Sequence, residues 1–308
     1  MKKTFFMLMV LAFSNALAAH SGPNFEASDI FKTLGKGDKV AILMVHFGTT
    51  HADTRALTID AINEKVKEEF PNVEFCEAYT SRIVVKRLGE RGIQKMNASQ
   101  ALEQLKAEGY THILIQATCI IDGVEMEALN NEVDQMRSSF KEIRIGDPLL
   151  YSPHDYENVI EVLAQKKDTS TAYIWIGHGT YDSSTAQYAM LDYMLKSKGY
   201  NNYFVATIEG YPEFDDVLMR LNSMKAKKVV LVPFLFVAGE HAKNDIAEDW
   251  KSDLEEKGFA VDVHMEGLGQ NPAIQDLFIS HLKFISHHRK IGIMKKKAIY
   301  EVTGEKMK

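Results

Sequence analysis

Two histidines in this sequence stand beside glycines, directly after apolar runs. His178 lies between Gly177 and Gly179 after the run 172–176, and His241 follows Gly239 and Glu240 after the run 229–237. Open α/β sheets bind ligands at the carboxyl ends of their strands, where glycine lets backbone and ligand approach closely. Two imidazoles at two strand ends therefore indicate a metal site.

A carboxylate occupies a third place of the same kind. Glu209 follows the apolar run 203–207. Because strand ends on one edge of a parallel sheet lie close together, we expect His178, Glu209 and His241 to converge. Two imidazoles and a carboxylate suit cobalt, iron, nickel or zinc, and they leave coordination positions open. The alternative for each histidine is a structural imidazole that is hydrogen-bonded within the fold.

Short apolar runs alternate with amphipathic segments along the chain. The predicted strands are 40–46, 73–78, 112–117, 143–145, 172–176, 203–207, 228–236 and 260–264. The predicted helices are 55–70, 99–107, 124–140, 156–166, 185–196, 213–224, 241–257 and 273–286. This alternation predicts βαβ units and an α/β fold with parallel sheets.

The chain also repeats itself weakly. His46-Phe47-Gly48-Thr49 matches Gly177-His178-Gly179-Thr180, Glu77 matches Glu209, and Gly123 matches Gly239. Three matches in the same order predict two similar halves, Rossmann-like or flavodoxin-like, with the site in the cleft between them. We place the halves at 19–150 and 151–286, with a basic tail at 287–308.

The first half does not keep the full set of candidate ligands. Phe47 stands where the repeat puts His178, and Glu125 stands where it puts His241. Glu125 could point into the same cleft and handle protons, or it could be a surface carboxylate at a helix start. His46 and His51 flank the first glycine turn and are further candidates to reach the cleft.

The N-terminus has the form of a signal peptide. Lys2 and Lys3 precede the apolar run 5–13, and Ala16-Leu17-Ala18 is a small-x-small cleavage site. We therefore expect residues 1–18 to be removed and the protein to be periplasmic or otherwise exported; the alternative is a buried N-terminal helix. No later stretch reaches the roughly 20 apolar residues that an integral membrane helix needs.

The composition and the missing motifs exclude some classes of binding partner. The formal net charge of −6 disfavours nucleic acid, which calls for a basic face. A dinucleotide fingerprint, a P-loop and a Gly-x-Ser-x-Gly elbow are all absent from the sequence. Cys76 and Cys119 could form a disulfide or remain free thiols, and the sequence leaves homo-oligomerisation open. The tail is predicted to be a surface extension without regular structure, with membrane-surface or partner binding as the lesser alternative.

Longer motifs connect these residues to a known family. They are 47–49 (FGT), 78–81 (AYTS), 120–125 (IIDGVE), 177–179 (GHG), 209–213 (EGYPE), 237–245 (VAGEHAKND) and 267–274 (GLGQNPAI). On these motifs the chain, from about residue 40 to 284, resembles the class II chelatases. It is most similar to the anaerobic sirohydrochlorin cobaltochelatases of cobalamin biosynthesis.

The resemblance implies a function and roles for particular residues. It implies a lyase that inserts Co²⁺, with Fe²⁺ or another divalent ion as a second metal, into a tetrapyrrole bound between the halves. The metal ligands carried over fall on His178, Glu209 and His241. His178 would also accept pyrrole protons, assisted by Glu125, since imidazole titrates near neutral pH.

The resemblance also points to substrate contacts and to two departures. The acidic macrocycle needs local cations, for which Arg82 and Lys243, with Lys86 and Arg87, are the candidates, and His46 is a further candidate contact. The chain has Cys119 where related sequences commonly have histidine, and His46 where they often have a small residue. An exported chelatase is unusual, so the alternative is an exported haem, tetrapyrrole or metal carrier, or a demetallase.

Overall fold

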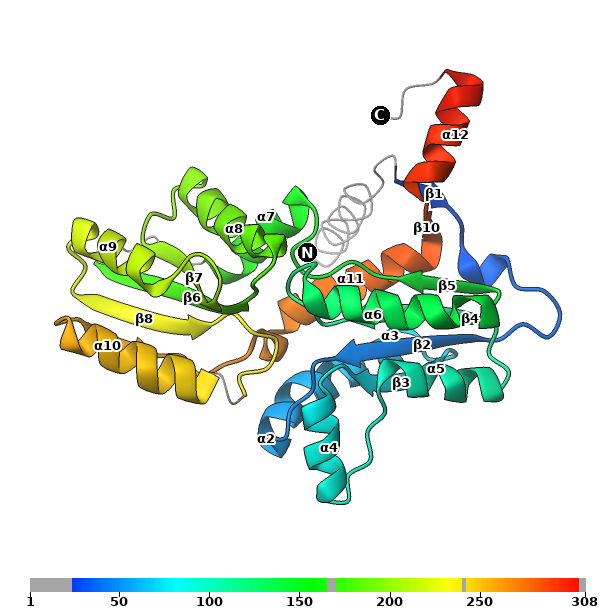
Figure 1. Cartoon of the computed structure of the whole chain (residues 1–308), viewed down its shortest axis with the longest axis horizontal. Helices are drawn as coiled ribbons and strands as arrows, with labels where there is room; N and C mark the ends of the chain where they lie inside the picture. Colours follow the sequence, from blue (N-terminus) through cyan, green and yellow to red (C-terminus); the bar gives the residue numbers. More distant parts are fainter. Residues whose placement is uncertain (1–23, 165–169, 240–241, 305–308) are drawn as a thin grey trace, which may run out of the picture.

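The computed structural model describes residues 24–164, 170–239 and 242–304. The predicted signal peptide at 1–18 and the predicted metal ligand His241 lie outside the described residues. Figure 1 shows two sheet-and-helix units side by side.

The first half is built on a parallel sheet with the strand order β3-β2-β4-β5. Its strands are β2 (Val40–His46), β3 (Glu74–Tyr79), β4 (His112–Ala117) and β5 (Glu142–Ile145). Alternate residues of β2 enter different cores because successive side chains point to opposite faces of a strand. Leu43 packs with α5 (Ala98–Ala107) and α6 (Val124–Met136), whereas Ile42 packs with α3 (Ala61–Glu69).

The second half repeats this arrangement with the order β7-β6-β8-β9. Its strands are β6 (Thr171–Gly179), β7 (Tyr203–Glu209), β8 (Lys228–Pro233) and β9 (Ala260–Val263). Helices α7 (Pro153–Leu163) and α8 (Ala186–Ser197) share one core with Trp175 of β6. Helices α9 (Phe214–Met224) and α10 (Lys251–Glu256) share the other core with Ile174. Both sheets place the first strand of the half second in the order, which confirms the predicted fold of two similar α/β halves.

Shorter segments complete the connections. They are α2 (Ala52–Arg55), α4 (Arg82–Glu90), the 3₁₀ turns η1 (Ile30–Lys32), η3 (Arg137–Ser139), η4 (Ser183–Thr185) and η6 (Leu268–Gln270), and the π-helical segments η2 (Ala56–Asp60) and η5 (Ala242–Trp250). Helix α4 was not among the predicted helices.

Helix α11 (Pro272–His287) returns to the first half. It follows β9 in the chain but packs against β4 and β5, and it also contacts α7. Phe278 and Leu282 of α11 share a core with Ile42 and Met44 of β2. The predicted division near residue 150 therefore separates the two sheets, but the last helix of the 151–286 segment lies on the first one.

The two ends of the described chain pair with each other. Strand β1 (Phe25–Ala27) runs antiparallel to β10 (His288–Lys290), and α12 (Ile293–Thr303) follows. The prediction of a tail without regular structure was wrong for residues 288–303. Among the described residues no helix is long and apolar enough to cross a membrane.

Candidate functional site

The carboxyl ends of the two sheets meet at the middle of the molecule (Figure 1). The loop after β4 touches the start of α8, where the Asp122 backbone N–H donates to Gln187 Oε1 at 3.2 Å. The loop after β2 approaches η5, where Lys243 Nζ lies 3.5 Å from His51 Nδ1. Ligand-binding edges of both halves therefore face one another.

His178 and Glu209 lie at adjacent strand ends. Gly179 pairs with Glu209 in the parallel register of β6 and β7, and His178 directly precedes Gly179. His178 is half-buried and Glu209 is exposed. The structure therefore brings two of the three predicted metal ligands to neighbouring positions on one sheet edge.

One hydrogen bond favours a particular tautomer of His178. Its Nδ1 lies 3.3 Å from the Gly179 carbonyl oxygen, which can only accept a hydrogen bond. Nδ1 therefore carries the hydrogen in the neutral ring, and Nε2 keeps its lone pair. A lone pair on Nε2 can bind a metal ion or accept a proton.

The turn after β7 holds Glu209 in place. The Tyr211–Pro212 peptide bond is cis, and the Thr207 hydroxyl donates to the Pro212 carbonyl at 3.0 Å. The Tyr211 backbone N–H donates to Thr185 Oγ1, also at 3.0 Å. Gly210 has φ of +94°, and a Cβ there would lie 2.4 Å from the Thr180 carbonyl oxygen. Only glycine fits this turn, so the position of Glu209 depends on it.

The third predicted ligand, His241, lies outside the described residues. Gly239 before it donates its backbone N–H to the Val237 carbonyl at 3.0 Å, and Lys243 after it bonds back to the Gly239 carbonyl at 3.2 Å. Within 24–164, 170–239 and 242–304, no group of three His, Cys, Asp or Glu side chains could hold a metal. The predicted set is thus represented here by His178 and Glu209.

Cys119 of the first half interacts electrostatically with Glu125 of its own half and with Tyr188 of α8 in the second half. Glu125 is half-buried in the first turn of α6. Burial first, and then the charges of Glu125 and Asp122, raise the pKa of the Cys119 thiol to about 12. Burial also raises the pKa of Tyr188 to about 12, with a smaller contribution from Cys119. Cys119 is therefore a neutral thiol near both Glu125 and Tyr188.

Tyr188 of α8 packs against the glycines at the end of β6. It hydrogen-bonds to the Gly179 backbone, and a Cβ at Gly177 would lie 2.2 Å from the Tyr188 ring. The sequence analysis did not single out Tyr188. Both cysteines are free thiols in the structure, with Cys76 buried on β3.

His46 is buried in the first half and is 1% exposed. Its Nδ1 lies 3.0 Å from the Thr118 hydroxyl, and its Nε2 lies 2.9 Å from Asn63 Oδ1. Since both ring nitrogens are engaged in the interior, the structure does not support the predicted contact between His46 and a substrate.

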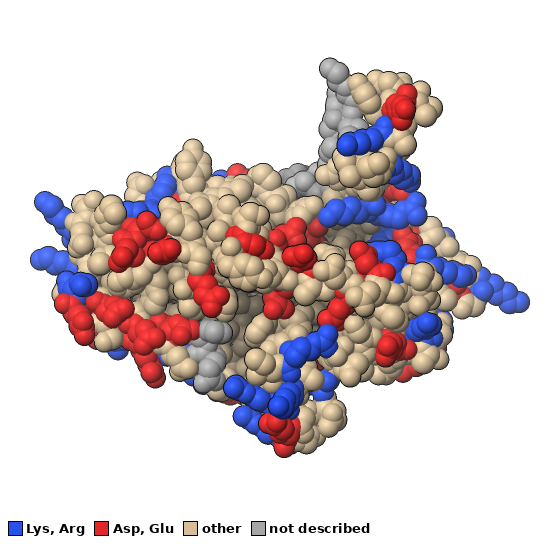
Figure 2. All heavy atoms as spheres, in the orientation of Figure 1, with Lys and Arg blue, Asp and Glu red and all other residues tan. Residues whose placement is uncertain are grey.

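The predicted cations differ in their surroundings. Lys243 is exposed and reaches the first half at His51. Arg82 forms an ion pair with Glu132 of α6 at 2.5 Å, and its side chain stays half-exposed. Arg82, Lys86 and Arg87 all belong to α4. Figure 2 shows a hollow between the second half and α4, with Lys and Arg atoms gathered on the α4 side.

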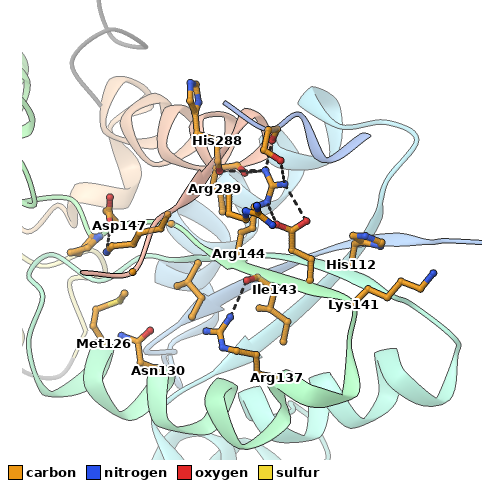
Figure 3. Close-up of a pocket in the computed structure, with 18 of the residues that line it drawn as sticks. His112, Met126, Asn130, Arg137, Lys141, Ile143, Arg144, Asp147, His288 and Arg289 are labelled. Carbon is orange, nitrogen blue, oxygen red and sulfur yellow. Dashed lines mark hydrogen bonds and ion pairs between the residues drawn. The ribbon is translucent and has the colours of Figure 1, made fainter. Parts of the chain in front are cut away.

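A cavity of about 730 Å³ lies elsewhere, between β5, α6 and β10 (Figure 3). Its basic side chains already have partners. Arg144 is bonded to Glu142 and to the Ser28 carbonyl, and Arg137 donates to the Ile143 carbonyl. This cavity lies between the first sheet and the C-terminal strand, and none of the predicted metal ligands lines it.

Comparison with known proteins assigns the family. The model of the cobalt chelatase (CbiK) family matches residues 40–287. This chain belongs to that family. A sirohydrochlorin cobaltochelatase of Salmonella typhimurium is 34% identical over 252 residues, which cover 79% of this chain and 95% of the relative. The sirohydrochlorin cobaltochelatase CbiKC of Nitratidesulfovibrio vulgaris is 30% identical over 254 residues, covering 79% and 89%.

Solved structures of chelatases share the fold of this family member. The sirohydrochlorin chelatase SirB of Bacillus subtilis subspecies spizizenii, solved in complex with cobalt, superposes with a TM-score of 0.56. It is 16% identical, and the match covers 80% of this chain and 94% of SirB. At that identity the likeness shows the fold alone. The match of the cobalt chelatase model ends at the last residue of α11, so β10 and α12 lie beyond it.

Proposed function

We propose that this protein is a sirohydrochlorin cobaltochelatase that inserts Co²⁺ into the tetrapyrrole and releases two protons. The observation that carries the proposal is the pairing of Gly179 with Glu209, which sets the two candidate ligands at adjacent strand ends in a cobalt chelatase family member. The 34% identity to the Salmonella enzyme over most of both chains supports the same substrate.

The chemistry requires a site that holds the ion weakly enough to release it. Co²⁺ would bind His178 Nε2 and the Glu209 carboxylate, with His241 as the third ligand. Three protein ligands leave positions through which water departs and pyrrole nitrogens enter. Fe²⁺ has similar ligand preferences, so we propose it as a second metal.

Two N–H protons must leave the macrocycle as its nitrogens bind the ion. The His178 imidazole can take one after its Nε2 has released the metal, because a neutral imidazole has a nitrogen lone pair that accepts a proton. Glu125 interacts with Cys119, which in turn interacts with Tyr188 beside the end of β6, and on this basis we assign Glu125 a supporting role in proton removal. The carboxylates of Glu125 and Glu209 would then act on opposite sides of the macrocycle.

The cationic rim supplies the attraction for an acidic substrate. We propose that Lys243 and the basic helix α4, including Arg82, contact the carboxylates of sirohydrochlorin. The ion pair of Arg82 with Glu132 leaves the Arg82 side chain 54% exposed, so it can still meet a second carboxylate.

We also propose that the enzyme is exported, with residues 1–18 removed as a signal peptide. The charged start, the apolar run 5–13 and the small residues before Ala19 support this assignment. The N-terminal sequence of protein recovered from the periplasmic fraction tests it directly. A chain that starts at Met1 and remains in the cytoplasmic fraction would contradict it.

The activity is tested by anaerobic absorption spectroscopy of sirohydrochlorin with catalytic amounts of protein and either Co²⁺ or Fe²⁺. We expect many turnovers per protein molecule, with a rate above that of the uncatalysed reaction for Co²⁺. His154→Ala, a change of a half-buried histidine in the first turn of α7, is the control for His178→Ala and should keep the rate. If the spectral change stopped after one tetrapyrrole per protein molecule, the protein would instead be a carrier.

A further inference from the structure

The two chain ends outside the family match form one structural unit. The match covers residues 40–287, whereas β1 precedes it and β10 and α12 follow it. β1 and β10 pair along their whole length, with Phe25 opposite Lys290 and Ala27 opposite His288. We call β1, β10 and α12 the terminal module. It lies beyond the residues that the family model matches, so the family comparison assigns it no role.

The base of the terminal module is fixed to the first half. The Phe25 ring contacts the Phe284 ring of α11 edge-on, with centroids 4.8 Å apart. The Ser28 backbone N–H donates to the His287 carbonyl at 2.8 Å, and the Ile291 N–H donates to the Asn24 carbonyl at 2.7 Å. Helix α12 therefore starts from a defined position on the protein.

Helix α12 itself projects away from the body (Figure 1). Lys296 is its only buried residue, and that side chain is bonded to Asn24 Oδ1. An isolated helix of this length is marginal in water, so α12 gains stability from a surface that covers it.

The side of α12 opposite Lys296 carries an apolar stripe. Met294, Ala298 and Val302 follow one another at intervals of four residues, which places them on one face of the helix. Met294 is 72% exposed and Val302 is 86% exposed. Lys295 and Lys297 flank the stripe. Ile293, Ile299 and Tyr300 are exposed as well, so apolar side chains emerge on several sides.

Charge identifies the kind of surface that fits. Residues 288–308 contain seven Lys or Arg and two Glu, although the whole chain has a net charge of −6. Pairing of α12 with α12 of a second copy would bring like charges together. A preformed protein groove would cover one face, whereas a fluid lipid surface accepts apolar side chains from several sides. Lysines beside exposed apolar residues are typical of segments that bind anionic lipid surfaces.

We propose that the terminal module docks the protein onto an anionic membrane surface through α12. Met294 and Val302 enter the headgroup boundary, while Lys295 and Lys297 bind lipid phosphates. The acidic body is held off the surface by the β1–β10 ribbon. Docking would keep the protein at the membrane without an integral segment.

Vesicle flotation tests the proposal on the chain that starts at Ala19, since the apolar run 5–13 would bind lipid by itself. We expect binding to vesicles containing phosphatidylglycerol, weak binding to phosphatidylcholine alone, and release at high salt. Lys295→Gln and Lys297→Gln should each weaken partitioning roughly fivefold. Met294→Glu should abolish binding, and Met219→Glu should not, because Met219 is 70% exposed on α9, outside the module.

Two further measurements separate folding and self-association from docking. Chelatase rate and melting temperature should be unchanged in Met294→Glu, since α12 lies outside the matched fold. Equal flotation of wild type and Met294→Glu would overturn the proposal. So would an oligomer in the absence of lipid that Met294→Glu dissociates, because α12 would then bind a second copy.

Discussion

The strand ends of the two halves share one backbone plan but differ in their exposure. Gly48 after β2 and Gly179 at the end of β6 both have positive φ, +96° and +82°. In the second half His178 is half-buried and Glu209 is exposed, whereas in the first half Phe47 takes the place of His178, 50% exposed, and the neighbouring His46 is buried. The second half therefore exposes an imidazole and a carboxylate at its strand ends, whereas the first half exposes a phenyl ring there and keeps its imidazole in the interior.

The internal set in the first half forms a continuous hydrogen-bonded chain. Asn63 Nδ2 donates to Glu77 Oε2 at 2.6 Å, and Glu77 is also paired with Lys95. The Asn63 amide oxygen therefore faces His46 and accepts from its Nε2–H. Burial lowers the pKa of the His46 ring and favours its neutral form, in which Nδ1 accepts from the Thr118 hydroxyl. The first half has no open imidazole at its first strand end because Phe47 takes the place of His178 and His46 is bonded in the interior.

The sharpest test of the comparison changes two glutamates that the sequence repeat aligns but the sheets place differently, with Glu77 inside β3 opposite Met44 and Glu209 at the end of β7 opposite Gly179. Glu209→Gln should lower the chelatase rate about 100-fold or more with little change in melting temperature, because it weakens a metal ligand on the surface. Glu77→Gln should do the opposite, costing about 1–2 kcal/mol of stability by leaving Lys95 without its charged partner. Steady-state rates and thermal unfolding of both variants measure the contrast; equal losses of rate would refute it.

His46→Ala probes the buried chain itself. Removing the ring leaves Asn63 Oδ1 and the Thr118 hydroxyl without their partner, so we expect a loss of about 2 kcal/mol in the free energy of unfolding. The chelatase rate at 15 °C should stay within about threefold of wild type. Urea unfolding and the absorption assay test this, and a large loss of rate without destabilisation would mean that His46 reaches the substrate after all.

Alanine substitutions at Gly48 and Gly179 test the difference between the two halves further. A Cβ at Gly179 would lie 1.6 Å from the Glu209 carbonyl oxygen, whereas a Cβ at Gly48 would lie 2.4 Å from the Tyr79 ring. Both alanine variants should be less stable, since alanine disfavours positive φ. Only Gly179→Ala should displace Glu209, and we expect it to weaken Co²⁺ binding about tenfold by titration calorimetry. A similar loss in Gly48→Ala would show that both halves bind the ion.

The smallest effect concerns the pH dependence of stability. Burial lowers the pKa of His46 below its ordinary value of 6.5, against opposing contributions from Glu77 and Asn63. Unfolded chains then bind a proton that the folded protein excludes, so stability is complete above pH 6.5 and falls as the pH drops below it. The loss is at most about 1.4 kcal/mol per pH unit. His46→Gln should remove this part of the slope between pH 6.5 and 5.5, and an unchanged slope would contradict the neutral ring.

The sequence predicted the sheets well because their strands are short apolar runs with clear ends. All eight predicted core strands are present, and 40–46 and 112–117 match β2 and β4 at both ends. Strand β6 runs three residues past its predicted end, to Gly179. The glycines suggested a turn there, but the chain stays extended and pairs with β7.

Other features depend on contacts that a linear pattern does not contain. The burial of His46 requires Asn63, Glu77 and Lys95, which are distant in the sequence. Helix α4 begins after the Ser81 cap, buries only Leu88 and leaves Ile83 65% exposed, so it has few core contacts. The return of α11 to the first sheet could not be read either, because each half offers an apolar face that would accept it.

The most direct test of the account is the rate of Co²⁺ insertion into sirohydrochlorin by His178→Ala, measured anaerobically beside wild type and His46→Gln. The account predicts a loss of about 100-fold or more in His178→Ala at an unchanged melting temperature, with most of the rate kept in His46→Gln. A His178→Ala rate within threefold of wild type would contradict the claim that the open strand ends of the second half carry the chelatase site.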